Sequence, residues 1–383
     1  MKIRPFELER WQSVWENRVG INISESGVQP LSFGELLEDS GILQELLSTP
    51  LGYPQTNGSE VTRARVAELY SGAGIHNVLM TSGCSEANFV IVWTLVEPGD
   101  EVVFMQPNYM QIAGVAESLG ATVRPLWLRE DLRWSFDHNK LRALITKRTK
   151  LIAICNPNNP TGAVLSEDAV NALCDRAAEV GAWILADEVY RGAEMEGPLT
   201  PSFWGRYERV LATGGLSKAY CLPGLRTGWI VGPPEMIARL WGTHDYTSVA
   251  PSMLTDRLTA IALEPAKRQR IRGRVRSILH QNLPRVRAWV EKHGLRMVPP
   301  AAGAVAWIGY DFDWRSDHLC EELRRKKDVL IVPGTQFSMP QFLRIGFGGE
   351  LTQLEAGLAL IDEFFAESPH ARSGKPTLRS RAV

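Results

Sequence analysis

Residues 150–190 read "KLIAICNPNNPTGAVLSEDAVNALCDRAAEVGAWILADEVY" and contain a complete strand–helix–strand pattern. Two short apolar runs, 150–155 and 182–187, are typical of buried strands, and the stretch 166–181 between them has the amphipathic period of a helix. A helix that joins two such strands indicates that they run parallel in one sheet. This segment therefore predicts an α/β fold.

The same alternation continues on both sides of this segment. Further strands are expected at 77–81, 101–105, 121–127, 209–215 and 227–232, and helices at 85–96 and 109–119. Helices between successive strands cover both faces of a mostly parallel sheet. We therefore expect a large domain over residues 40–270, built as a parallel sheet sandwiched by helices.

From about residue 270 the pattern changes. A long charged helix pattern at 268–294 precedes short strands at 304–310 and 341–348. We expect a smaller α+β domain made of residues 1–39, as an N-terminal arm, and 271–369. The polar and basic residues 370–383 have no periodicity and are expected to form a mobile tail.

Composition excludes several classes of protein. The chain has 383 residues, 44% hydrophobic and 22% charged, with a net charge of −1, so it lacks the basic footprint of a nucleic-acid-binding domain. It has no apolar run of about 18 residues that could cross a membrane. The five cysteines and seven histidines show no metal-site or disulfide spacing. We expect a cytoplasmic protein without metal, nucleic-acid or membrane partners.

Ligands of parallel sheets bind beyond the carboxyl ends of the strands, so the loops there are the candidate site. After 77–81, the turn containing Gly83, Cys84 and Ser85 opens a helix, where free N–H groups and the helix dipole suit a phosphate. A plain helix cap is the alternative. After 150–155, the "NPNNPTG" loop is a rigid turn that directs an asparagine into the crevice, or a turn without chemistry.

Two further loops carry charges. Asp187 ends a buried strand and needs a positive partner, which could also be a core salt bridge. Lys218 lies in "LSKAYCLPGLRTGW" (216–229), where cations and apolar walls are expected to weaken its charged form and make it a nucleophilic amine. Arg226 could hold a phosphate, although a surface lysine and arginine would look the same. Together, the four loops offer a phosphate site, an acid, oxygen ligands and a lysine, which are the contacts that pyridoxal 5′-phosphate (PLP) requires.

The motifs "NPNNPTG", "ADEVY" and "SKAYCLPGLRTGW", in this order, resemble fold-type I PLP-dependent enzymes of the class I/II aminotransferase superfamily over residues 20–365. The resemblance implies a homodimer with shared active sites and an amino-acid substrate. It implies that Lys218 binds the cofactor and moves protons, and that Asp187 holds the ring nitrogen. The other implied cofactor contacts are Gly83, Cys84, Ser85, Tyr109, Asn159, Tyr190, Ser217, Arg226 and, from the neighbouring subunit, Tyr53.

The resemblance also implies substrate contacts and shows two departures, at Gly215 and at Cys221, which replaces a common glycine after "SKAY". Arg344, in "QFLRIGFG", matches the arginine that grips the substrate α-carboxylate, and Gly27 matches a small residue that lies over the substrate. Gly215 stands where a phosphate-binding Ser or Thr is usual. That contact is therefore expected to be lost or to come from a neighbour such as Thr213.

A second resemblance concerns the reaction. "LERW" (8–11), "ISESGVQPLSFGEL" (23–36) and "HDYTSVAPSML" (244–254) are similar to segments of capreomycidine-synthase-type enzymes. It implies that a hydroxylated arginine, bound as an external aldimine and converted to a quinonoid, is dehydrated and cyclised to a cyclic guanidino amino acid. A conventional aminotransferase that yields an α-keto acid stays open as the alternative. A catalytically silent PLP-binding protein is disfavoured by the intact lysine, aspartate and arginine set.

A guanidinium substrate needs an anion, because one carboxylate can accept two of its N–H bonds. The candidates are Glu9, Glu25 and Asp245. An exposed helix charge is the alternative for Glu9, and a helix-end charge is the alternative for Asp245.

Overall fold

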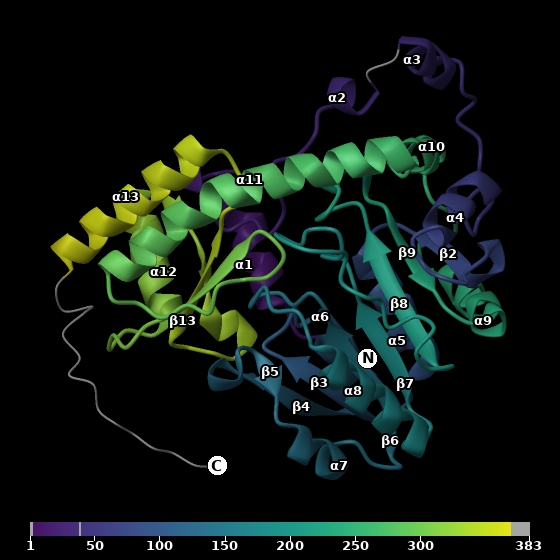
Figure 1. The fold of residues 1–383 in the computed structure, drawn as a ribbon, viewed down its shortest axis with the longest axis horizontal. Helices are drawn as coiled ribbons and strands as arrows, with labels where there is room; N and C mark the ends of the chain where they lie inside the picture. The colour runs from purple at the N-terminus through teal and green to yellow at the C-terminus, as the bar shows by residue number, and fades with distance from the viewer. Residues whose placement is uncertain (1–2, 38–39, 369–383) are drawn as a thin grey trace.

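The computed structural model describes residues 3–37 and 40–368. A central eight-stranded sheet has the order β2-β9-β8-β7-β6-β3-β4-β5 (Figure 1). Its strands are β2 (Val78–Thr81), β3 (Glu101–Gln106), β4 (Thr122–Arg129), β5 (Ser135–Phe136), β6 (Thr149–Cys155), β7 (Trp183–Asp187), β8 (Val210–Gly215) and β9 (Gly228–Val231). Strands β8, β7, β6, β3 and β4 pair in parallel, while β9 and β5 run antiparallel to their neighbours. The predicted mostly parallel α/β sheet is confirmed.

Strand β6 shows how the sheet is covered on both faces. Leu151 and Ala153 pack in the apolar cluster that contains helices α5 (Cys84–Leu95), α6 (Gln111–Ser118) and α9 (Pro234–His244). Ile152 and Ile154 point to the opposite face and pack with α8 (Glu167–Val180) and α7 (Leu141–Leu144). Because successive side chains of a strand point to opposite faces, a continuous apolar run fits a sheet that is buried on both sides.

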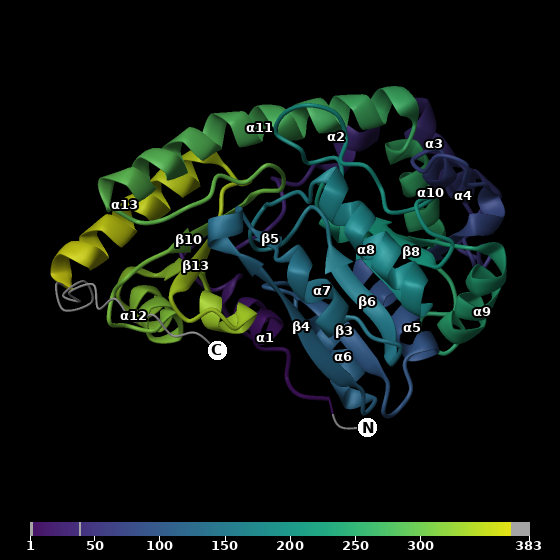
Figure 2. The same ribbon diagram turned by 60° about the horizontal axis from the view of Figure 1, so that its bottom comes forward.

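The second sheet is small and antiparallel, in the order β10-β13-β12. Its strands are β10 (Val305–Gly309), β12 (Val332–Pro333) and β13 (Phe342–Gly346), and the helices around it are α12 (Ser316–Lys327) and α13 (Leu351–Glu367). The long helix α11 (Pro265–Lys292) runs along both parts of the molecule (Figure 2). The expected domain limit at residue 270 therefore falls inside a continuous helix.

The N-terminal arm joins the C-terminal part of the protein. Strand β1 (Ile21–Asn22) pairs in parallel with β11 (Val329–Leu330). Helix α1 (Glu7–Trp15) precedes it, and the chain then passes through α2 (Phe33–Leu37), α3 (Ser40–Leu47) and α4 (Glu60–Ala67), which packs on α10 (Met253–Ala262). None of the helices in the described residues is both long and apolar enough to span a bilayer. The expected tail, 370–383, lies outside the described residues.

Candidate active site

A pocket of about 320 Å³ opens at the carboxyl ends of β6, β7 and β8. Most of the residues that the sequence singled out line it. These are Glu9, Glu25, Cys84, Ser85, Tyr109, Asn159, Asp187, Tyr190, Ser217, Lys218, Arg226 and Arg344. Segments from both sheets and from the N-terminal arm therefore meet at the edge where parallel sheets bind ligands.

Asp187 is buried at the end of β7 and is held by neutral donors. Its carboxylate accepts hydrogen bonds from Asn88 Nδ2 (2.9 Å), from the backbone N–H of Val189 (3.1 Å) and from Cys84 Sγ (3.6 Å). Within residues 3–37 and 40–368, no Lys, Arg or His forms an ion pair with it, which excludes the core salt bridge. Burial raises the pKa of Asp187. A buried carboxylate of this kind is suited to receive a cationic ligand.

The N-terminus of α5 lies against Arg226 and Gly228, in a space that a side chain at Gly83 or Gly228 would occupy. Gly83 has a φ of 88°, and a Cβ there would lie 2.6 Å from Arg226 Nη2. A Cβ on Gly228 would lie 2.4 Å from the backbone N of Cys84. Glycine is therefore required at both positions, so that the helix N-terminus and the arginine lie together. This pairing combines free N–H groups with a guanidinium and suits a phosphate.

The departure at Gly215 has a steric cause. A Cβ at this position would lie 2.7 Å from the carbonyl oxygen of Thr227, so a serine or threonine would not fit. The suggestion that Thr213 replaces the missing contact is not supported. Thr213 is fully buried, and its Oγ1 donates to Asn88 Oδ1 at 3.0 Å, so it supports the Asp187 network instead.

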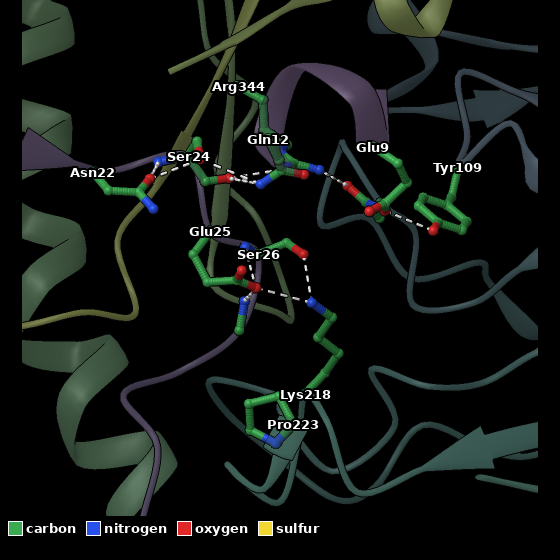
Figure 3. Close-up of polar contacts among 12 residues, drawn as sticks. Glu9, Gln12, Asn22, Ser24, Glu25, Ser26, Tyr109, Lys218, Pro223 and Arg344 are labelled. Carbon is green, nitrogen blue, oxygen red and sulfur yellow. Dashed lines mark hydrogen bonds and ion pairs between the residues drawn. The ribbon is translucent and has the colours of Figure 1, made fainter. Parts of the chain in front are cut away.

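Lys218 reaches into the pocket and is bound by the N-terminal arm (Figure 3). Its Nζ donates to Ser26 Oγ at 2.8 Å and to Glu25 Oε1 at 3.0 Å. Burial lowers the pKa of Lys218, but Glu25 and Tyr190 outweigh burial, so the pKa is raised overall. The expectation that its surroundings weaken the charged form is therefore wrong for the protein without cofactor. Lys218 in turn lowers the pKa of Glu25 to about 2.

Gly27 lies close to this lysine. A Cβ on Gly27 would lie 3.4 Å from Glu25 Oε1, 3.5 Å from the carbonyl oxygen of Ser217 and 3.9 Å from Lys218 Cδ. The backbone N–H of Gly27 also donates to Glu25 Oε1 at 2.9 Å. The arm residue that was expected over the substrate thus lies beside the lysine that lines the pocket.

Arg344 on β13 is 1% exposed and lines the same pocket. Its Nη1 donates to Asn159 Oδ1 at 3.1 Å, and its Nη2 donates to the carbonyl oxygen of Ser24 at 2.8 Å. Its Nε is buried and has no hydrogen-bond partner among the described residues. A buried guanidinium without a carboxylate partner is suited to bind the carboxylate of a ligand.

Two tyrosines complete the walls. Tyr109 donates its hydroxyl hydrogen to Glu9 Oε1 at 2.7 Å and packs edge-on against Phe6 at 4.7 Å. Burial and the nearby Glu9 raise the pKa of Tyr109. Tyr190 is 4% exposed, and burial raises its pKa as well. Both phenols therefore stay protonated and can act as hydrogen-bond donors.

Four predicted residues are not in the pocket lining: Gly27 and Gly83 lie next to lining residues, whereas Tyr53 and Asp245 are solvent-exposed. Tyr53 is 87% exposed. Asp245 is exposed at the end of α9 and does not line the pocket. The structure therefore does not bring Asp245 to the place where a substrate cation would bind in the same protomer.

Sequence reasoning missed several pocket residues. Asn88, Gln12, Glu16 and Ser26 all lie at the pocket. Asn88 had a detectable signal, because it is an amide within the otherwise apolar helix "NFVIVW" one turn after the glycine turn. Residues 9, 12 and 16 share one helix face by their spacing, but α1 was expected only as part of an arm.

The chain matches the family model "Aminotransferase class I and II" over residues 40–361. It is 35% identical to capreomycidine synthase of Streptomyces vinaceus over 361 residues, covering 93% of this chain and 92% of that protein. The structure of a PLP-dependent aminotransferase from Streptococcus suis has a TM-score of 0.90 at 34% identity, covering 96% and 99% of the two chains. The PLP-dependent cyclase OrfR has a TM-score of 0.87 at 27% identity, covering 96% and 98%.

The residues present fit PLP. Asp187 is a buried acid that pairs with no cation of the described residues, the turn at Gly83 lies against Arg226 and suits an anion, and Lys218 lines the same pocket. These are the contacts that the ring nitrogen, the phosphate and the aldehyde of PLP require. The chain therefore belongs to the class I and II aminotransferase family and is a PLP-dependent enzyme of fold type I.

Proposed function

We propose that this enzyme converts a hydroxylated arginine into a cyclic guanidino amino acid. The observation that carries the proposal is the acidic wall that the N-terminal arm adds to the pocket. Glu9, Glu16 and Glu25 line the same pocket as Arg344. One cation-binding side and one carboxylate-binding side suit an amino acid with a guanidinium side chain. The similarity to capreomycidine synthase and to the cyclase OrfR supports this choice.

The side chains around the pocket have separate tasks in this reaction. When bound, PLP supplies an electron sink next to the substrate α-carbon. Arg344 would bind the α-carboxylate through its free Nε, while Asn159 and Ser24 hold its other nitrogens. Asp187 would place its negative charge at the ring nitrogen. In its neutral amine form, Lys218 Nζ, oriented by Ser26 and Glu25, would take the α-proton.

The overall reaction balances without any further reactant. The bond between the hydroxyl oxygen and its carbon in the substrate breaks, and a bond forms between the same carbon and a guanidine nitrogen. The hydroxyl group and the proton lost by that nitrogen leave as one water. Lys218 would return the α-proton to the α-carbon, so no oxidant or reductant is needed.

A conventional transaminase is the second candidate. The same lysine, aspartate and arginine serve amine transfer equally well, since members of one fold share a site and differ in reaction. The similarity to the Streptococcus suis protein, whose structure is described as a PLP-dependent aminotransferase, favours this alternative.

The products distinguish the two candidates. With a side-chain-hydroxylated arginine and no keto-acid acceptor, we expect repeated turnover to a product that is lighter by one water and keeps its amino group. Mass spectrometry of the products, with a panel of common amino acids as controls, measures this. An α-keto acid formed only with an amine acceptor would contradict the cyclase assignment and support the transaminase.

We also propose that the enzyme acts as a homodimer with shared active sites. The segment before α4 lies beside α9, because Trp241 Nε1 donates to Thr56 Oγ1 at 2.9 Å. The exposed apolar residues near this contact in the sequence are Leu47, Leu51, Tyr53, Trp241, Tyr246 and Val249. Exposed apolar patches of this kind mark association surfaces. A second copy would bury Tyr53 and could bring it to the neighbouring phosphate cradle.

Subunit mixing tests the shared site. Tyr53→Ala and Lys218→Ala are each expected to be inactive alone. After exchange of subunits in equal amounts, half of the dimers carry one intact site, so about a quarter of the wild-type activity should return. Activity is measured after exchange has been verified with two affinity tags. No recovery in verified heterodimers would contradict shared sites.

A further inference from the structure

Helix α1 presents a polar face to the pocket. Glu9, Gln12 and Glu16 are spaced three and four residues apart, so they lie on one side of the helix, and all three line the pocket. Figure 3 shows Gln12 between Ser24 and Glu9, beside Arg344. A helix face with two carboxylates and an amide therefore borders the site where the substrate side chain would lie.

The position of α1 is fixed on its outer side. Trp11 Nε1 donates to the carbonyl oxygen of Ile331 at 2.9 Å. The guanidinium carbon of Arg324 lies 3.6 Å from the centre of the Trp15 ring, a cation–π contact. These contacts attach the helix to the small sheet and its helix α12.

The inner side of α1 is tied to the arginine of the site. Gln12 is 8% exposed, and its Nε2 lies 3.3 Å from the carbonyl oxygen of Ser24 and 3.2 Å from Ser24 Oγ. The same carbonyl oxygen accepts a hydrogen bond from Arg344 Nη2 at 2.8 Å. Ser24 thus connects α1 to Arg344, so the distance between Arg344 and the carboxylates of Glu9 and Glu16 is fixed by these hydrogen bonds.

The three carboxylates of the acidic wall differ in what they already bind. Glu25 is paired with Lys218 at 3.0 Å, and Glu9 accepts the hydroxyl of Tyr109 at 2.7 Å. The Glu16 carboxylate has no hydrogen bond or ion pair with any residue of 3–37 and 40–368. Burial and the charges of Glu25 and Glu9 raise the pKa of this half-buried carboxylate, and the charge of Lys218 opposes them only in part.

A second observation points to a ligand in the same pocket. Arg344 is 1% exposed, and its Nε has no hydrogen-bond partner among the described residues. Among the described residues, the pocket therefore holds one half-buried carboxylate that no protein group pairs and one guanidinium with an unused buried donor. A ligand with a carboxylate at one end and a cation at the other would satisfy both.

We infer that Glu16 is the specificity-determining residue that binds the guanidinium group of the substrate. This inference rests on the proposed function and selects one residue for it. Glu16 was not among the residues that the sequence suggested for this role. In the structure Glu25 pairs with Lys218 and Glu9 accepts from Tyr109, whereas Asp245 does not line the pocket.

Two ligands that cannot react test this inference. 5-Guanidinopentanoate keeps both ends of arginine but lacks the amino group, so it cannot bond covalently to PLP. 5-Ureidopentanoate is its uncharged counterpart of the same length. Calorimetric titration of the PLP-loaded protein gives the dissociation constant of each. We expect Glu16→Gln and Glu16→Ala to weaken the guanidino ligand about 10- to 100-fold, the effect of losing a charged hydrogen bond. The ureido ligand should change less than about twofold, because it has no charge to lose.

A matched control lies on the same helix. Glu7 is exposed on α1 and does not line the pocket, so Glu7→Gln makes the same charge change without the contact and should bind both ligands as the wild type does. An unfolding midpoint equal to that of the wild type excludes a folding defect in each Glu16 variant. If one variant fails to fold, the binding data of the other still test the inference.

The outcomes separate the inference from the proposed function. If the wild type prefers the guanidino ligand and neither Glu16 variant loses that preference, the role of Glu16 is overturned and the cationic substrate stands. If the wild type binds both ligands equally, the arginine-like substrate and the role of Glu16 both fall.

Discussion

Lys218→Ala should lower turnover by at least about 10⁴-fold, because it removes both the amine that binds the cofactor and the base that moves the α-proton. Lys218 is the only lysine that lines the pocket in the described part of the protein. The purified variant should also lose the visible absorbance of lysine-bound PLP. Steady-state kinetics and an absorbance spectrum measure the two effects.

An exposed lysine provides the control for this experiment. Lys140 is exposed at the end of a short 3₁₀ helix and does not line the pocket, so Lys140→Ala should keep full activity and the normal spectrum. A Lys218→Ala protein that still forms a borohydride-reducible adduct and turns over normally would disprove the assignment of the lysine.

Asp187→Asn should slow turnover by about 10²- to 10³-fold, the usual effect of removing one preorganised electrostatic contact from a reaction centre. Asparagine keeps the shape of the aspartate group but cannot balance the charge of a protonated ring nitrogen. The measurement is turnover at saturating PLP. Asp175, exposed on α8, offers a matched control, and Asp175→Asn should be unaffected.

Stability provides a second readout for Asp187. Burial raises the pKa of Asp187 in the folded protein. As the pH rises above the pKa that this group has in the unfolded chain, the unfolded state loses its proton more readily than the folded state, so the free energy of unfolding falls. The neutral asparagine removes this penalty. The cofactor-free variant should therefore unfold at the same or a higher temperature than the wild type at neutral pH. A large drop would show that the activity loss reflects structural damage, and near-wild-type turnover would show that the ring nitrogen has another partner.

The sequence by itself determined the central sheet and the residues at its carboxyl edge. The apolar run 150–155 became β6 and 182–187 became β7, because a strand buried on both faces needs a continuous apolar stretch, which is a local property. The side chains that follow such parallel strands lie at the ligand-binding edge of the sheet, and this position does not depend on the other parts of the fold. Asp187, Lys218 and an asparagine of the "NPNNPTG" loop were found in this way, and the family motifs specified Asn159 and added Arg344.

Only the tertiary structure decided how those residues are partnered. Lys218 is bound by Glu25, which is 193 residues away in the sequence, and this contact reverses the expected direction of its pKa shift. The two-residue pairing of β1 with β11, too short to leave a sequence pattern, brings the arm to the site. Glu16, on the same arm, lines the pocket, whereas Asp245 at the end of α9 does not. Local sequence could not fix these contacts, because the electrostatic environment of a residue depends on every charge near it in space, whatever its distance along the sequence.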